Sequence, residues 1–159
     1  MAYDSAKVPS IFKSIKWRAF TVNLDIGGGE FEDATMYLAE RDVTNLVYDP
    51  DHRSSEHNRD VIVTVIARGG SDSVTLANVL NVIPKWKDRD ALLYYSDFLA
   101  KKNAPIYIGV YEGDKSGRGR KTNTGWQANL QLHEYLDAVR NKFRVVSATN
   151  EMITAVKDL

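Results

Sequence analysis

Hydrophobic positions along most of the chain alternate between strand-like and helix-like spacing. The strand-like segments are rich in β-branched and aromatic residues, and glycine or Asp-Pro turns separate them from amphipathic stretches. This spacing predicts strands at 20–26, 45–49, 73–78 and 104–111, and helices at 30–40, 55–67, 88–102 and 126–141. Alternation of this kind is typical of a Rossmann-like α/β fold, in which helices cover both faces of a mainly parallel sheet in three αβα layers.

The two ends of the chain depart from this alternation. Ile11, Phe12 and Ile15 lie three to four residues apart, which predicts a short amphipathic helix. We therefore expect residues 1–19, a basic segment, to cap a single domain that spans residues 20–159. At the other end, two strand-like runs follow each other with only a short Asn150-Glu151 link, which predicts an antiparallel terminal hairpin.

Composition narrows the functional classes. The 159 residues fit one domain, and 21 basic residues balance 21 acidic ones, so net charge gives no case for a nucleic-acid or membrane partner. The absence of cysteine excludes disulfides, thiolate metal sites and a cysteine nucleophile. No apolar run approaches the roughly 18–20 residues of a membrane span, and no secretory signal is visible. We expect a cytoplasmic protein without a membrane partner.

The sharpest chemical signal is a glycine turn after the first strand. Asp25 precedes Gly27-Gly28-Gly29, and Asp49 follows twenty residues later at the end of the next strand. A carboxylate at that place accepts hydrogen bonds from ribose hydroxyls in dinucleotide-binding folds. Glu32 replaces the third glycine of Gly-x-Gly-x-x-Gly, which argues against a pyrophosphate. The alternative is an ordinary glycine turn with a capping role.

An ordered set of motifs carries a resemblance to a known family. The motifs are Leu24–Gly29, Val47–Pro50 and Ala77–Pro84, followed by Val110–Arg120 and Gly125–Asn129. They resemble class I S-adenosylmethionine (SAM)-dependent methyltransferases, in the form found in a bacterial and phage group that includes methyltransferases associated with DNA phosphorothioation. The resemblance implies a seven-stranded sheet whose last strand is antiparallel. It also implies a cofactor-binding set of Asp25, Gly27, Gly28, Gly29, Asp49, Pro50 and Asn78.

The resemblance assigns roles within that set. Asp25 would orient the turn or contact the methionyl amine of SAM through water. Gly27 and Gly29 would lie close to the methionine part of SAM, and Asp49 would bind the ribose hydroxyls. Asn78 would lie beside the transferable methyl group. The sequence also departs from the family: Phe31 replaces a small residue and would narrow the cofactor site. Only one helix fits between Asp49 and Ser73, so the βα unit that usually serves the adenine is shortened or lost.

Further candidates surround the expected mouth of the site. Methyl transfer mainly requires that the acceptor be positioned in line with the methyl group, and a base is needed only if the acceptor must lose a proton. The candidate catalytic residues are Asn78, Asn81 and Glu112. The candidate substrate-binding residues are Tyr111, Asp114, Arg118, Arg120 and Trp126. A basic loop beside an aromatic side chain can hold phosphate and stack a base. The alternatives are turn capping by the asparagines and an ordinary solvated loop.

These observations predict a SAM-dependent methyltransferase. The acceptor is either small or held by the N-terminal segment, by loop 113–125 or by a second subunit of a homo-oligomer. Nucleic acid is the favoured acceptor. Two alternatives stay open: a degenerate SAM-binding protein that regulates a partner, and an enzyme that consumes SAM by another route. Histidines and carboxylates gather in residues 49–57, but without ordered ligand spacing, so we expect no metal.

Overall fold

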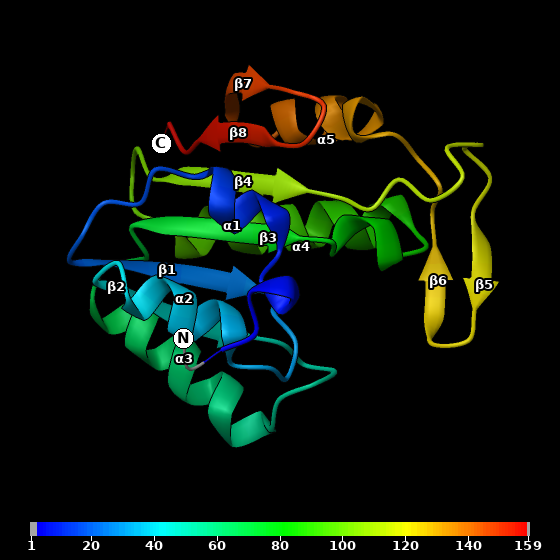
Figure 1. Ribbon diagram of the computed structural model, residues 1–159. Coiled ribbons are helices and arrows are strands. Elements are labelled where there is room, and N and C mark those ends of the chain that lie inside the picture. The colour runs from blue at the N-terminus through cyan, green and yellow to red at the C-terminus, as the bar shows by residue number, and fades with distance from the viewer. Residues whose placement is uncertain (1–2, 159) are drawn as a thin grey trace.

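A six-stranded sheet runs through the middle of the computed structural model, which describes residues 3–158 (Figure 1). The strand order is β2-β1-β3-β4-β8-β7. β1 to β4 pair in parallel, and β8 lies antiparallel to both β4 and β7. The strand bounds are β1 Thr21–Ile26, β2 Val43–Tyr48, β3 Ser73–Ala77, β4 Pro105–Gly109, β7 Arg144–Ala148 and β8 Ile153–Val156. The predicted mainly parallel sheet and terminal hairpin are confirmed.

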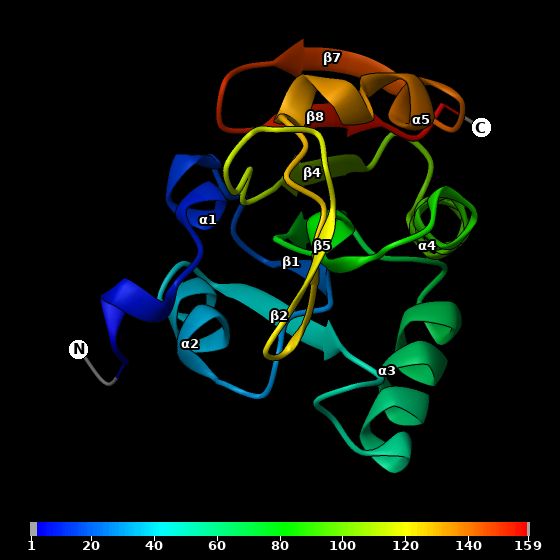
Figure 2. The ribbon, with the colours of Figure 1, turned by 90° about the vertical axis from the view of Figure 1, so that its right-hand side faces the viewer.

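Helices cover both faces of the sheet (Figure 2). α1 (Ser10–Ser14) and α2 (Asp33–Ala39) lie on one face. The other face carries α3 (Ser55–Ala67), α4 (Trp86–Leu99) and α5 (Leu136–Arg140). Residues 3–158 also contain three 3-10 turns: η1 (Ser5–Lys7), η2 (Leu80–Val82) and η3 (Leu132–Tyr135). The structure therefore has the predicted αβα layers. None of the helices in the described part of the chain is long and apolar enough to cross a membrane.

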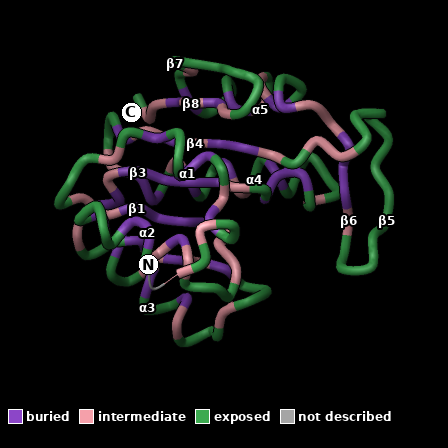
Figure 3. The backbone as a smooth tube through the Cα atoms, viewed as in Figure 1, coloured by how far each residue is buried: buried purple, intermediate pink, exposed green. Residues whose placement is uncertain are grey.

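The central strands are buried on both faces (Figure 3). Leu24, Leu76 and Ile106 are fully buried, and α3, α4 and α5 pack on them from one side. The sequences of such parallel strands are nearly continuous apolar runs, because neither face of the strand meets water. Because β1, β2, β3 and β4 run parallel, their carboxyl ends lie at the same edge of the sheet.

The N-terminal segment belongs to a second core cluster. Val8, Ile11 and Phe12 are buried with Tyr37 and Leu38 of α2. Ile11 also fits into a notch over Gly109, where an added Cβ would lie 2.5 Å from the Ile11 Cγ2 atom. α1 is thus a fixed wall above the carboxyl end of β4, packed by apolar side chains.

The sheet has one strand fewer than the family resemblance implies. β2 is the edge strand, and within residues 3–158 the chain passes from α3 directly into β3. The expected seven-stranded sheet is therefore wrong, while the predicted loss of a βα unit after Asp49 is confirmed. Fewer than 25 residues separate β2 from β3 and α3 occupies most of them, so the chain is too short for another strand and helix.

The region after β4 also differs from the prediction. Loop 113–124 contains β5 (Arg120–Thr122), which forms a two-stranded hairpin with β6 (Gly125–Gln127). The predicted helix at 126–141 is wrong over residues 126–131, since helical structure begins only at η3. The turn lies at Asn123 and Thr124, and the Trp126 ring lies where a side chain at Gly119 would stand. This cross-hairpin packing outweighs the helical spacing of the sequence.

Candidate functional site

The turn after β1 requires glycine for two physical reasons. Gly27 and Gly29 have positive φ values of +74° and +79°, a region that other residues rarely adopt. An added Cβ at Gly28 would lie 2.5 Å from an Asp25 carboxylate oxygen and 2.9 Å from Val47 Cγ1. At Gly29, by contrast, an added Cβ would have no neighbour within 4 Å. The turn is thus packed from beneath at Gly28 and open at Gly29.

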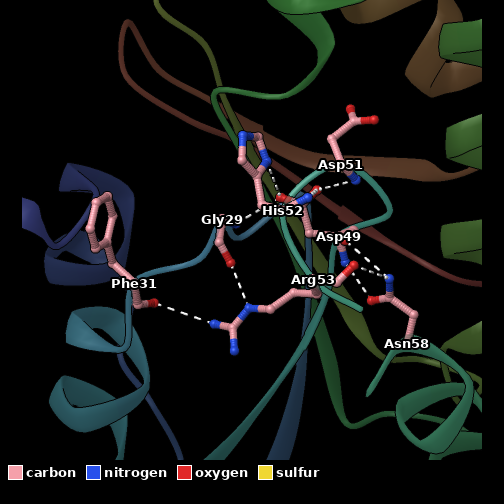
Figure 4. Close-up of polar contacts among 7 residues, drawn as sticks. All are labelled: Gly29, Phe31, Asp49, Asp51, His52, Arg53 and Asn58. Carbon is pink, nitrogen blue, oxygen red and sulfur yellow. Dashed lines mark hydrogen bonds and ion pairs between the residues drawn. The ribbon is translucent and has the colours of Figure 1, made fainter. Parts of the chain in front are cut away.

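Asp49 joins this glycine turn to the loop after β2 (Figure 4). The residue is only 4% exposed, and one carboxylate oxygen accepts a 2.8 Å hydrogen bond from the Gly29 amide. The other oxygen accepts bonds from the backbone amides of Asp51 (3.0 Å) and His52 (3.2 Å). Three backbone amides thus converge on this carboxylate and fix its position between the glycine turn and the loop.

Two side chains of this loop and one of α3 hold the arrangement together. The Asn58 amide pairs with the Asp49 backbone, accepting from its N–H at 2.9 Å and donating to its C=O at 3.0 Å. Arg53 donates to the Gly29 carbonyl at 2.7 Å and to the Glu32 carboxylate at 2.6 Å. The His52 ring lies 3.1 Å from the Asp49 carboxylate, and 58% of its side chain is exposed. His52 is therefore the Asp49 partner that water or a ligand can replace most easily.

These loop residues were missing from the predicted site. The sequence signal was present, because residues 49–57 are dense in polar side chains directly after a strand. Arg53, however, bonds to Gly29 and Glu32, which lie more than twenty residues away across the glycine turn, and no spacing rule identifies these partners. The histidines of this stretch contact protein atoms, since the His57 ring lies 2.7 Å from the Val47 carbonyl oxygen. No group of three or more metal-ligating side chains forms among the residues that the structure describes.

Phe31 does not narrow the space above the glycine turn. Its side chain points away from Asp49 (Figure 4), and the residue is 58% exposed. The Lys7 ammonium lies 4.7 Å from the centre of its ring, a cation–π distance. The expected obstruction is therefore wrong, because the N-terminal segment draws this ring to the outside of the turn.

Asp25 lies beneath the turn, in a buried polar network that the sequence did not indicate. Its carboxylate accepts hydrogen bonds from Thr75 (2.9 Å) and Asn45 (3.4 Å), and Thr75 in turn accepts one from Asn23 (3.0 Å). Burial raises the pKa of Asp25 to about 6, although the Thr75 and Asn45 hydrogen bonds oppose the rise. The network spans β1, β2 and β3, so Asp25 supports the glycine turn from within the sheet.

Asn78 lies at the carboxyl end of β3, beneath the N-terminal wall. It adopts a positive φ of +59°, and its backbone N–H donates to the Gly109 carbonyl at 2.9 Å. A cavity of about 30 Å³ opens here between Asn78, Gly109 and the Pro9–Ile11 segment, with Glu151 at its side. This space holds about one water molecule.

Asn81 and Glu112 make structural bonds beyond this cavity. The Asn81 amide donates to Gln127 of β6 at 3.0 Å, and its buried oxygen has no partner among the described residues. Gln127 donates onward to the Tyr111 carbonyl at 2.9 Å. Glu112 accepts from the Leu132 amide at 2.7 Å, at the start of η3. These bonds attach the β5–β6 hairpin and the segment after it to the end of the sheet.

The β5–β6 hairpin extends beyond the carboxyl edge of the sheet (Figure 1). Arg120 pairs with Asp114 at 2.6 Å, and hydrogen bonds from Ser116 lower the pKa of this exposed carboxylate, with Arg120 contributing. The side chains of Arg118 and Lys121 are exposed. The indole N–H of Trp126 is buried without a partner in the described structure, because its ring lies against Gly119. The hairpin therefore presents cations, while Trp126 stabilises it.

Comparison with known proteins identifies the fold. No family model matches the sequence, and a search of curated proteins finds no relative. Solved structures do match. A 1,6-didemethyltoxoflavin-N1-methyltransferase from Burkholderia thailandensis, bound to S-adenosylhomocysteine, is 17% identical with a TM-score of 0.63, over 89% of this chain and 72% of that one. The chain shares the Rossmann-like α/β fold of this methyltransferase.

Two further structures agree over nearly the whole chain. A SAM-dependent methyltransferase from Methanosarcina mazei is 13% identical with a TM-score of 0.66, over 94% of this chain and 97% of that one. A TehB-like SAM-dependent methyltransferase from Corynebacterium glutamicum is 13% identical with a TM-score of 0.56, over 99% and 88%. In a methyltransferase fold with parallel strands, ligands bind beyond the carboxyl ends of the strands. The glycine turn, Asp49 and Asn78 all lie at that edge.

Proposed function

We propose that the protein is a SAM-dependent methyltransferase whose cofactor lies across the glycine turn and Asp49. The observation that carries the proposal is the buried Asp49 carboxylate, which accepts a hydrogen bond from the Gly29 amide at the carboxyl ends of neighbouring strands. A carboxylate and a glycine turn at this edge suit a ribose and the chain attached to it. The methyltransferase fold supports the same assignment.

The residues present fit an adenosyl group. Gly29 has open space where a side chain would stand, so a ligand can approach its backbone closely. Ribose hydroxyls would donate to Asp49 in place of the exposed His52 ring, while the backbone amides hold the carboxylate in position. Asp25 would hold the turn in shape from beneath, and Asn78 would lie toward the methyl group. When bound, SAM supplies a methyl group already activated by its sulfonium, so this chain would mainly orient cofactor and acceptor.

The adenine would lie beside Pro50, on the face where the lost βα unit would otherwise stand. A hollow of about 410 Å³ opens there between the end of β2 and α3. Its lining includes Tyr48, Pro50, Arg59 and Ile62. These side chains offer apolar surface to a planar base and a cation at the rim. The hollow adjoins Asp49, as a ribose between the two sites requires.

For the acceptor we propose nucleic acid, held by the β5–β6 hairpin. Arg118 and Lys121 are exposed on a projecting arm, and exposed cations attract the phosphate backbone without regard to sequence. Tyr111 is 64% exposed where the arm begins, and so offers a ring for base stacking. The resemblance to the phosphorothioation-associated group rests on the sequence motifs and stays a prediction, as does a homo-oligomer that completes the site.

Calorimetry tests the cofactor site. SAM and S-adenosylhomocysteine should bind the wild type, and Asp49→Ala should weaken SAM by about 1–3 kcal/mol, the scale for losing charged hydrogen bonds. Asp51→Ala is the matched control, because it removes a neighbouring exposed carboxylate and keeps the backbone amide that Asp49 uses. An unchanged affinity in Asp49→Ala would remove Asp49 from the site. No binding to the wild type at millimolar concentration would refute the proposal.

Methyl transfer separates the enzyme from a SAM-binding regulator. Tritium from methyl-labelled SAM should enter DNA or RNA, and Arg118→Ala combined with Lys121→Ala should reduce that transfer at unchanged SAM affinity. Lys87→Ala, an exposed cation on α4, controls for charge alone. Binding of SAM without transfer to DNA, RNA or cell extract would favour the regulatory alternative. Breakdown of SAM without transfer would instead favour its consumption by another route.

A further inference from the structure

A second cavity lies at the opposite edge of the sheet from the cofactor site. It measures about 350 Å³ and opens at the amino ends of β1, β3 and β4, toward the left in Figure 1. Three segments far apart in the sequence build it: residues 16–18 before β1, the start of β3, and loop 101–105 between α4 and β4. No residue proposed for the methyltransferase site lines this cavity.

The lining is strongly basic in a chain whose net charge is zero. Lys16, Arg18, Lys101 and Lys102 face it, and Asp72 is the one carboxylate among the described residues of its lining. Asp72 is already compensated, because it lies 3.2 Å from Lys101 and 3.2 Å from the Arg68 guanidinium. The remaining positive charges have no counterpart in the cavity wall, so the cavity attracts anions.

Asp72 acts as an anchor for this edge. Its carboxylate accepts a 2.8 Å hydrogen bond from the Val22 amide at the start of β1. Partial burial works to raise the pKa of Asp72, but the Val22 hydrogen bond and the two cations outweigh burial and lower it. Asp72 therefore favours its charged form, and this carboxylate pairs with Lys101 at the cavity.

One wall of the cavity is aromatic and rigid. The Trp17 and Tyr107 rings meet edge to face, with centroids 5.9 Å apart. The Trp17 indole donates to the Phe12 carbonyl at 2.9 Å, and its ring also contacts the buried Phe12 ring. Tyr107 is half-buried on β4, directly beside the cationic loop. A planar group in the cavity would thus meet a preformed apolar surface.

We propose that this cavity binds a nucleoside phosphate. The phosphate would lie among Lys16, Arg18 and Lys102, since guanidinium and ammonium groups form strong charge-assisted bonds with phosphate oxygens. The base would lie against Trp17 and Tyr107, because every base offers a π-face to an aromatic wall. The ligand is either a free nucleotide or the terminal nucleotide of a nucleic acid. The proposal is independent of the methyltransferase function.

Calorimetric titration with adenosine monophosphate tests the chemistry of the cavity. Adenosine and inorganic phosphate serve as half-ligands, and each should bind at least tenfold more weakly than the monophosphate. The double variant Lys16→Ala/Arg18→Ala should reduce binding of the monophosphate at least tenfold. Both residues are exposed and lie outside the sheet, so the fold should survive, which circular dichroism checks. Lys87→Ala is the matched control and should bind as the wild type does.

Two further measurements locate the ligand and identify its source. Asp49→Ala removes the carboxylate of the opposite edge, and binding of the monophosphate should be unchanged. A loss in this variant would place the nucleotide in the cofactor site and overturn the proposal. The proposal would also be overturned if the monophosphate did not bind at millimolar concentration, or if it bound Lys16→Ala/Arg18→Ala as tightly as the wild type. Binding of inorganic phosphate as tight as that of the monophosphate would overturn it as well. A 5′-phosphorylated decanucleotide that binds more tightly than the monophosphate identifies a nucleic-acid end; otherwise the ligand is a free nucleotide.

Discussion

Asp25 should make the stability of the protein depend on pH in an unusual direction. Burial raises its pKa from 3.8 to about 6, against hydrogen bonds from Thr75 and Asn45. Between those two values the folded protein binds more protons at Asp25 than the unfolded chain does. The free energy of unfolding therefore falls as the pH rises through this window. Most carboxylates act in the opposite sense, because pairing lowers their pKa.

The size of the effect follows from the shift. A rise of about two pKa units corresponds to about 3 kcal/mol, at 1.36 kcal/mol per unit. Asp25→Asn removes the ionisation and keeps the shape and the hydrogen bond from Thr75. The stability of the variant relative to the wild type should thus increase by about 2–3 kcal/mol between pH 4 and pH 7.5.

Urea unfolding at several pH values measures this difference directly. The contributions of other titrating groups cancel in the difference between the two free energies of unfolding, because these groups are common to the variant and the wild type. Asp90→Asn, an exposed carboxylate on α4, reports the effect of removing one surface charge. If the stability curves of Asp25→Asn and the wild type run parallel from pH 4 to pH 7.5, the reasoning about the buried carboxylate is refuted.

Three further substitutions test the packing around the candidate site. Gly28→Ala places a Cβ 2.5 Å from the Asp25 carboxylate, so we expect a loss of about 1–3 kcal/mol in urea unfolding; unchanged stability would mean that the turn can yield. Ile11→Ala empties the notch over Gly109 and should cost about 2–5 kcal/mol, seen as a lower melting temperature; a negligible shift would mean that α1 is loosely attached. Asn58→Ala leaves the Asp49 amide without its partner and should cost about 1–3 kcal/mol in the same unfolding assay; full stability would show that water replaces the side chain.

Local patterns predicted much of this fold because local physics decides those parts. Apolar spacing gave each central strand and most helices, and α3 begins and ends at the predicted residues, 55–67. The glycine turn was predictable because its backbone conformation excludes other residues. Asp49 was predictable because a carboxylate directly after the second parallel strand must lie beside that turn.

The tertiary structure alone decided which side chains meet. Arg53 and Asn58 contact the turn and Asp49 through bonds that no periodicity encodes, and the hairpin around Trp126 overrode a helical pattern through contact with Gly119. The basic cavity joins three separate segments: residues 16–18, the start of β3 and loop 101–105. Each of these features depends on geometry between distant segments, where burial and charge are set by neighbours in space. A sequence pattern reports only the neighbours along the chain.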